Sequence, residues 1–242
     1  MTPPGAASLA AALEAARLVD LTQLLGPATA LWPGSSPFVA TTVATYERDQ
    51  CYARELAFPE HAGTHLDAPS HFIPGQARVH ELDPTTFLRP LVKLDVRPWV
   101  GEDETVSIGR EVIEELEARD GAITPGVVVV VHTGWDAHVS NADRYLGPNG
   151  TTAFPGLAAS AAELLVERRV AGLGIDTLST DVGGSPSQEV HLCFLPSGAW
   201  QLEGLVNLAA LPPRGAWIVV APLNLVDGSG TPARVFAIVP AS

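Results

Sequence analysis

Short apolar segments recur along the chain and alternate with longer amphipathic ones. The short segments are rich in β-branched and aromatic residues and predict strands, because such side chains fit a pleated, half-buried surface. The predicted strands lie at 19–22, 38–46, 52–58, 91–96, 126–131, 172–175, 217–225 and 234–239. Apolar residues at helical spacing predict helices at 8–18, 108–119 and 157–168.

This alternation of strands and helices predicts an α/β or α+β fold with a mixed sheet. The strand at 126–131 is entirely apolar, so we expect it to be buried on both faces. A chain of 242 residues with 46% hydrophobic residues can bury a full core, and no change of composition marks a linker. We therefore expect an N-terminal helical extension at 1–17 and one domain at 18–242.

Charge and cysteine content narrow the possible partners. The net charge of −13, with only 14 Lys and Arg residues spread along the chain, argues against a nucleic-acid surface. Two cysteines without paired spacing form no disulfide framework and suit a reducing cytosol. No run of 18 apolar residues is present, so we expect a cytoplasmic protein without a membrane segment.

Candidate chemistry is concentrated between residues 61 and 71, where three of the seven histidines and an aspartate lie close together. His61, His65, Asp67 and His71 form an N/O ligand set that suits Zn²⁺ or a similar divalent ion. Three ligands from one short segment are typical of a catalytic site that keeps a coordination position for water. A histidine-rich surface loop, or buried histidines bonded to backbone, would be the structural alternative.

The spacing of these ligands requires a bend. A straight strand at about 3.3 Å per residue would hold His61 and Asp67 roughly 20 Å apart, too far for one ion. Gly63 lies between the two histidines and tolerates unusual backbone angles, so we expect the bend there. Pro69 should stiffen the chain toward His71.

The same segment matches in full the pattern H-x-G-T-H-x-D-x-P-x-H and resembles the metal-dependent cyclase family, which includes bacterial kynurenine formamidase and isatin hydrolase. Further likeness lies in Val19-Asp20-Leu21-Thr22, in Leu31-Trp32-Pro33-Gly34 and in the segment 174–179. A second ligand pair, twelve residues apart, is matched by His191 and Glu203. The resemblance covers residues 18 to 240 and implies a swivelling β/β/α fold.

The resemblance also implies roles for individual residues. A first metal ion would be held by His61, His65 and Asp67, and a second by His191 and Glu203, with Asp67 and Glu203 able to bridge. His71 would be the catalytic proton donor and acceptor, which we expect to titrate near pH 6.5. The cofactor would be Zn or Mn, one or two ions per chain.

The activity implied is a metal-dependent hydrolase that cleaves amide C–N bonds other than peptide bonds. Its substrate would be a small aromatic amide: an aryl formamide such as N-formylkynurenine, in tryptophan catabolism, or a cyclic aryl amide such as isatin. Two alternatives stay open, a cyclase or lyase acting on a related ring and a non-catalytic metal-binding or ligand-binding module. The resemblance further implies a homodimer or higher homo-oligomer.

Three other residues have two interpretations each. Trp32 lies on a predicted loop, where it is either core packing or an aromatic wall for a flat substrate ring. Cys193 lies two residues after His191 and is either a ligand or an inert buried thiol. His132 precedes Thr-Gly-Trp, where relatives often carry a basic residue, so it bears on substrate preference.

Overall fold

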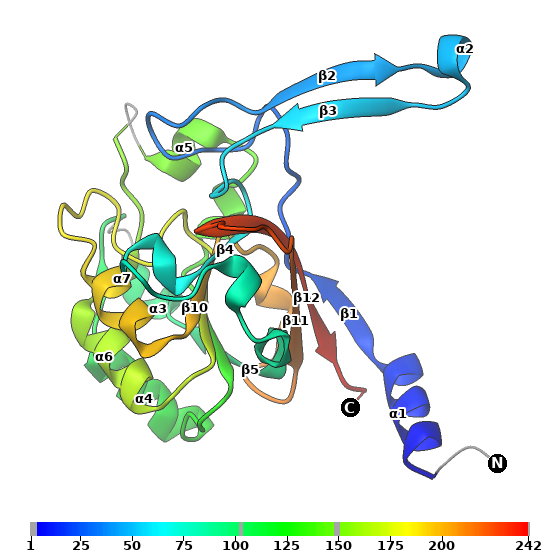
Figure 1. Ribbon diagram of the computed structural model, residues 1–242. Helices are drawn as coiled ribbons and strands as arrows, with labels where there is room; N and C mark the ends of the chain where they lie inside the picture. The colour runs from blue at the N-terminus through cyan, green and yellow to red at the C-terminus, as the bar shows by residue number, and fades with distance from the viewer. Residues whose placement is uncertain (1–3, 102–103, 148–150, 242) are drawn as a thin grey trace.

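The fold is that of a computed structural model that describes residues 4–101, 104–147 and 151–241 (Figure 1). Eight strands form one mixed sheet, and because β12 pairs with both β11 and β4, the sheet closes into a barrel with β1 at its outer edge. In spatial order the strands are β1 (Arg17–Asp20), β12 (Gly230–Val239), β11 (Trp217–Pro222), β5 (Leu88–Asp95), β7 (Val128–His132), β9 (Gly172–Ile175), β10 (Trp200–Glu203) and β4 (His65–Asp67).

Helices cover the parallel part of the barrel. Strands β5, β7, β9 and β10 run parallel to one another, and α4 (Arg110–Asp120), α6 (Ala159–Glu167) and α7 (Glu189–Phe194) pack over them (Figure 1). The remaining short elements are α2 (Tyr46–Asp49), α3 (Arg97–Val100), β6 (Ser107–Ile108), α5 (Ala142–Leu146) and β8 (Gly156–Leu157). Single turns of 3₁₀ helix are η1 (Pro69–His71), η2 (Val79–Glu81), η3 (Pro84–Phe87), η4 (Trp135–His138), η6 (Leu195–Ser197) and η7 (Leu208–Ala210).

The position of strand β7 between two cores explains why its sequence is entirely apolar. Val129 and Val131 belong to the core under the helices, whereas Val128 and Val130 belong to the core inside the barrel. Successive side chains of a strand point to opposite faces, so a strand with a core on each side needs apolar residues throughout. The predicted burial on both faces is confirmed.

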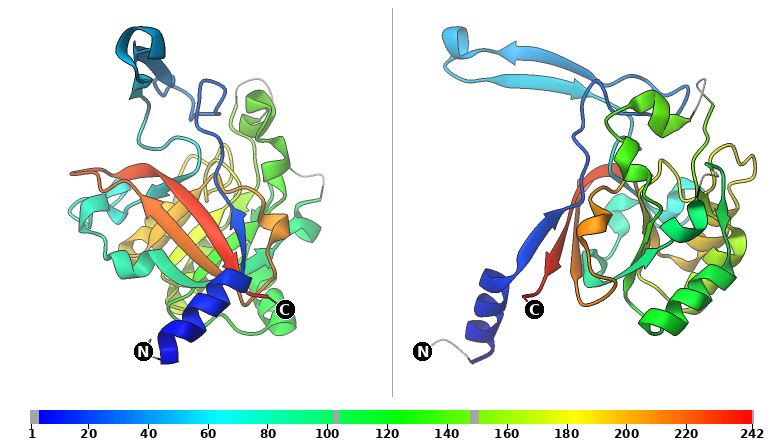
Figure 2. Two further views of the ribbon diagram at one scale, coloured as in Figure 1. Left: turned by 90° about the vertical axis from the view of Figure 1, so that its right-hand side faces the viewer. Right: turned by 180° about the vertical axis from the view of Figure 1, so that it is seen from behind.

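Two elements project from the body on the same side. The hairpin of β2 (Val39–Ala44) and β3 (Ala53–Ala57), here called the arm, extends well beyond the barrel, and α1 (Pro4–Ala15) extends below it (Figures 1 and 2). Nearly every arm residue in these strands is exposed. Among the described helices, none is both long and apolar enough to cross a membrane.

The mixed-sheet fold expected from the sequence is confirmed, and the predicted strands all occur, 172–175 with the predicted ends and the others with shifted ends. The predicted first helix, 8–18, begins and ends later in the chain than the observed one. Helix α1 ends at Ala15, and residues 17–20 form β1. Leu18 looks helical within an alanine-rich segment, but β1 pairs with residues 236–239 of β12. This distant pairing overrides local helix propensity.

Candidate metal centre and substrate pocket

The histidine-rich segment bends at Gly63, as the ligand spacing predicts. Gly63 adopts a left-handed φ of 63°, and its carbonyl accepts a hydrogen bond from Nδ1 of His65 at 2.9 Å. The hydroxyl of Thr64 donates to the carbonyl of Gly204 at 2.5 Å, which fixes the bend against the end of β10. The chain then enters β4, where His65 and Asp67 point to one face because they are two residues apart.

Strand β10 and helix α7 bring the distant candidates to this face. Glu203 is the cross-strand partner of His65, and its carboxylate lies 3.4 Å from Nε2 of His65. Nε2 of His191 lies 3.3 Å from Glu203 and 3.5 Å from Asp67. The structure therefore gathers these four residues around one point.

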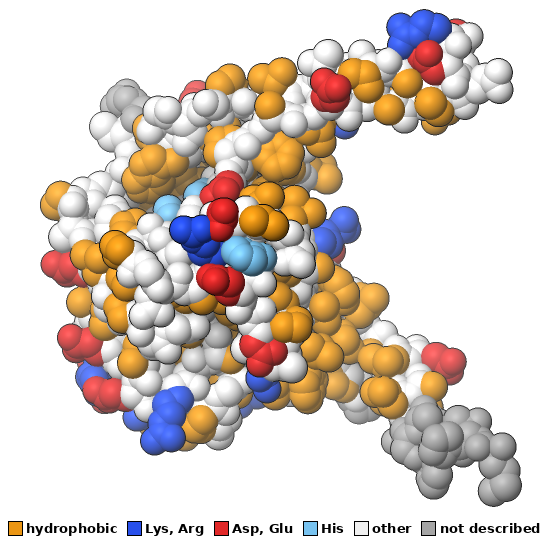
Figure 3. All heavy atoms as spheres, in the orientation of Figure 1, with side chains coloured by type: hydrophobic (Ala, Val, Ile, Leu, Met, Phe, Trp, Pro, Cys, Tyr) orange, Lys and Arg blue, Asp and Glu red, His pale blue; other side chains and the backbone are white. Residues whose placement is uncertain are grey.

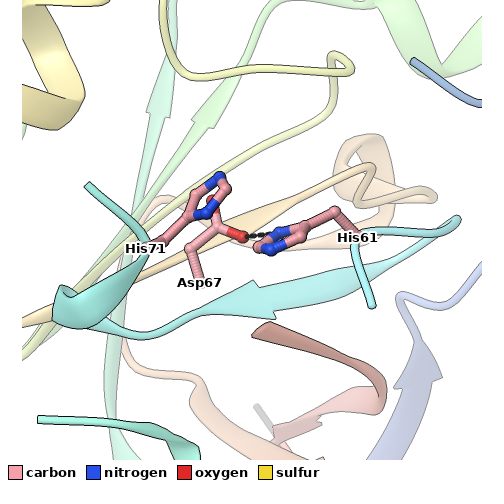
Figure 4. A group of neighbouring side chains, drawn as sticks. All are labelled: His61, Asp67 and His71. Atoms are coloured by element: carbon pink, nitrogen blue, oxygen red, sulfur yellow. Dashed lines mark hydrogen bonds and ion pairs between the residues drawn. The ribbon is translucent and has the colours of Figure 1, made fainter. Parts of the chain in front are cut away.

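His61 and His71 complete the cluster around Asp67 (Figure 4). Nδ1 of His61 lies 2.6 Å from Oδ1 of Asp67, and the imidazole rings of His61 and His71 stack with centroids 3.8 Å apart. The ligand atoms thus form two groups that share Asp67, one with His65 and Glu203 and one with His61 and His71. This grouping differs from the expected one, in which His61 and His65 share an ion and His71 stands apart.

The two buried carboxylates of this cluster favour a cation between them. Asp67 and Glu203 are buried, which by itself raises the pKa of a carboxyl, but the surrounding imidazoles hold the pKa of both below the usual value. Burial alone would lower the pKa of His65, yet Asp67 and Glu203 raise it to about 10. The two carboxylates therefore demand positive charge between them, which protons on the imidazoles or a divalent ion can supply.

The donor set fits a divalent metal ion. Oδ2 of Asp67 is buried without a hydrogen-bond partner among the described residues, although the site around it is polar. A buried carboxylate oxygen left without a hydrogen bond is costly, and a metal ion would satisfy it. Imidazole nitrogens and carboxylate oxygens together are ligands for Zn²⁺ and Mn²⁺.

Neighbouring residues that the sequence analysis missed orient the candidate ligands. The carboxylate of Asp181 lies 2.5 Å from Nδ1 of His191, so the other ring nitrogen faces the cluster. The backbone N–H of Thr180 donates to Glu203 at 2.8 Å. Nε2 of His61 lies 3.1 Å from the hydroxyl of Ser229, which donates to Glu60 at 2.7 Å. No local pattern in the sequence marks Asp181, Thr180 or Ser229 for such a role.

The cluster forms the base of a cavity of about 350 Å³. Its walls are mainly apolar, and Phe72 packs beside the ring of His191 with centroids 4.5 Å apart. Trp32 is 40% exposed and meets Phe154 edge to face, so it is not a core residue. The lining residues are Ala30, Trp32, Ser35, Pro59, His61, Gly63, His65, His71, Phe72, Leu178, Ser179, Gln188, His191 and Glu203.

The structure shows the surroundings of three further residues, His71, Cys193 and His132. Burial, with the neighbouring imidazoles of His61 and His191, lowers the pKa of His71 to about 4, below the expected value near 6.5. Cys193 packs against the core under the helices, as the interpretation of an inert thiol requires. His132 lies in a separate cluster with Asp136 and Asp176 and does not line the cavity.

Comparison with known proteins is consistent with this geometry. The cyclase family model matches residues 19–182. Isatin hydrolase of Roseibium aggregatum is 29% identical over 241 residues, with 92% of each chain covered. Kynurenine formamidase of Salinibacter ruber is 29% identical, covering 90% of this chain and 95% of its own. The solved structure of isatin hydrolase A from Ralstonia solanacearum superposes with a TM-score of 0.91, at 34% identity, covering 99% of this chain and 98% of its own.

Proposed function

The chain belongs to the cyclase family, and we propose that it is a metal-dependent hydrolase that cleaves the amide C–N bond of a small aromatic amide. The observation that carries this proposal is the convergence of His65, Asp67, His191 and Glu203 at the base of an aromatic-walled cavity. Near full-length similarity to isatin hydrolases and kynurenine formamidases supports the same chemistry.

Within this class, a neutral cyclic aryl amide such as isatin is the favoured substrate. Trp32 and Phe72 offer flat faces to an aromatic ring, and none of the described residues that line the cavity is Lys or Arg. N-formylkynurenine carries an amino-acid carboxylate, which would find no Lys or Arg side chain in this lining. The match to isatin hydrolase A, at 34% identity, points the same way.

The residues divide the chemical work. The ion would be held by His65, Asp67, His191 and Glu203, with His61 beside Asp67. A bound divalent ion supplies Lewis acidity and lowers the pKa of water toward neutrality. His71 lies on the cavity wall, where it would accept a proton and return it to the departing nitrogen, the poor leaving group of an amide. Phe72 and Trp32 would exclude bulk water and orient the ring.

A direct assay tests the proposal. Purified protein, stripped of metal and then reloaded with Zn²⁺ or Mn²⁺, is incubated with isatin or with N-formylkynurenine, and products are followed by mass spectrometry. We expect ring opening of isatin with the mass of one water added, restored by metal. Activity toward N-formylkynurenine alone would reverse the substrate preference. Full activity of the metal-free protein, or no turnover of either compound with metal bound, would contradict the proposed function.

The same experiment distinguishes the proposed hydrolase from the alternative, a lyase or cyclase. A lyase or cyclase would move protons or close a ring without consuming water, so the product of hydrolysis, one water heavier, would be missing. An oxygen-18 label from the solvent appears in the new carboxylate of the product only if the enzyme hydrolyses the amide.

A further inference from the structure

Three neutral polar side chains line the cavity without belonging to the metal-ligand cluster, those of Ser35, Ser179 and Gln188. The other described lining residues are members of the cluster, apolar residues or Gly63. Figure 3 shows histidine side chains in a hollow of the molecule, among mainly apolar side chains. Ser35 is exposed to solvent, so Ser179 and Gln188 are the neutral polar groups that a buried substrate would meet.

The hydroxyl of Ser179 has a proton to donate and no acceptor within the described chain. Ser179 is only 3% exposed, and its Oγ accepts a hydrogen bond from the backbone N–H of Asp181 at 3.2 Å. No described residue accepts the proton of the hydroxyl itself. Buried polar groups are normally hydrogen-bonded, and a hydroxyl can donate as well as accept. The free proton of Ser179 therefore suits an acceptor bound in the cavity.

The backbone of Gln188 is strained where its side chain reaches the cavity. Its φ of 49° and ψ of 44° are left-handed, a conformation that glycine and asparagine adopt more easily than glutamine. The side-chain amide donates once, from Nε2 to the carbonyl of Ser185 at 3.3 Å, which leaves its second proton free. Strained residues cluster at ligand sites, where the position of the side chain offsets the cost.

Asp181 connects these two side chains to the candidate metal centre. Its own N–H donates to Ser179, and its carboxylate accepts from the backbone N–H groups of Val190 at 2.8 Å and His191 at 3.3 Å. Gln188 immediately precedes α7, the helix that carries His191. Ser179 and Gln188 are therefore held in fixed positions beside one candidate ligand, as groups that recognise a substrate must be.

The substrates of the proposed function share one polar atom that the cluster leaves without a partner. Isatin and N-formylkynurenine both carry a ketone on the ring carbon next to the one that bears the amide nitrogen. In the proposed function the amide carbonyl faces the candidate metal centre and the nitrogen faces His71. A ketone oxygen can only accept hydrogen bonds, and burying it without a donor is costly.

We propose that Ser179 and Gln188 donate hydrogen bonds to this ketone oxygen and restrict the substrates to aromatic amides with a ketone beside the amide nitrogen. This inference rests on the proposed function, because it requires the amide at the candidate metal centre. It extends that function from aromatic amides in general to one class, the ortho-acyl anilides. Oxindole and simple anilides lack the ketone and would leave both donors unpaired.

Calorimetric titration of the metal-loaded full chain with two ligands tests the proposal without turnover. One ligand is 2-aminophenylglyoxylate, the ring-opened form of isatin, which keeps the ketone. The other is 2-aminophenylacetate, in which a methylene group replaces the ketone. Ser179→Ala and Gln188→Met should each weaken binding of the keto compound about 3- to 10-fold and change binding of the methylene compound by no more than about twofold.

Ser187→Ala is the matched control, because it removes the same hydroxyl from an exposed residue that does not line the cavity. It should leave the affinity for both ligands unchanged. Elemental analysis of each variant should show wild-type metal content. If Ser179→Ala loses metal through a shift of Asp181, Gln188→Met decides the question alone.

Two results would overturn the inference. One is a wild type that binds the keto compound no more tightly than the methylene compound, and the other is an equal loss of affinity for both ligands in the variants. Hydrolysis of isatin by a wild type without this preference would leave the proposed function intact. A clear ketone preference in a protein that does not open isatin would contradict the proposed function and not the recognition of the ketone.

Discussion

The backbone of Gly230 lies against the imidazole ring of His61 so closely that a Cβ atom at this position would overlap the ring. Gly230 is also the cross-strand partner of Asp67 where β12 closes the barrel. The closure of the barrel and the position of one candidate ligand are therefore set by the same backbone contact.

Gly230→Ala should displace His61 and weaken metal binding about 10- to 100-fold, the usual effect of disturbing the surroundings of a ligand. The measurement is a competitive titration with a chromophoric chelator. Gly26→Ala is the control, because a Cβ atom there meets nothing within 4 Å. Equal affinities in the two variants would show that His61 takes no part in binding.

Glu203→Gln should reduce metal stoichiometry. The carboxylate of Glu203 faces both His65 and His191, and the substitution replaces a charged ligand with a neutral amide. We expect weaker binding of the ion, while His65, Asp67 and His191 keep some affinity. Elemental analysis measures the metal, and unchanged stoichiometry with unchanged activity would contradict a role for Glu203.

His71→Ala should lower kcat by about 10²- to 10⁴-fold, the typical contribution of a general acid or base, while metal content stays near wild type. The result matters because His71 also belongs to a possible ligand group with His61 and Asp67. If the substitution strips the metal, His71 is a ligand and the proton carrier must be another residue.

Trp32→Ala should raise KM roughly 2- to 10-fold with a smaller effect on kcat, because it removes a stacking face on the cavity wall. Trp32→Phe keeps an aromatic face and serves as the control. Steady-state kinetics with isatin distinguish the two variants. An unchanged KM in Trp32→Ala would mean that the ring binds elsewhere.

The stability of the fold should depend on pH through Asp176. Burial raises the pKa of this carboxyl to about 6, outweighing the hydrogen bonds from Thr133 and Gly134 that lower it. Between pH 4 and 6 the folded chain keeps this proton while the unfolded chain, with a pKa of 3.8, loses it. Stability contributed by the neutral carboxyl is therefore lost as pH rises through this window, by about 3 kcal/mol.

Urea unfolding at pH 4 and pH 7 measures this effect as the difference between wild type and Asp176→Asn, which cannot ionise. The free energy of unfolding of wild type relative to the variant should fall with rising pH. Asp143→Asn, at an exposed position on α5, makes the same change of charge at the surface and is the control. A difference independent of pH would show that Asp176 is already ionised at pH 4.

Local patterns predicted the elements and the candidate ligands. A strand with apolar residues throughout can only be buried on both faces, and ligands that share an ion require a bend at Gly63. Both expectations are confirmed because they depend on adjacent residues.

What local patterns could not predict are contacts between distant segments. Strand β4 has three residues, too few for a periodic signal, and is held by β10 and β12. The approach of Glu203 to His65 depends on that register. The exposure of the arm could not be predicted from the sequence either. Alternating apolar residues give the same pattern whether the body of the chain or a partner covers them.

Strand β12 also determines when the candidate metal site can form during synthesis of the chain. One end of β12 pairs with β4, which carries His65 and Asp67, and the other end pairs with β1, the first strand. A nascent chain that has left the ribosome only as far as residue 229 has made all six candidate metal-site residues but cannot hold β4 from both sides. Such long-range pairing forms late and slowly. Metal capture should therefore coincide with the last step of folding, and a chain that stalls before β12 should emerge without the ion.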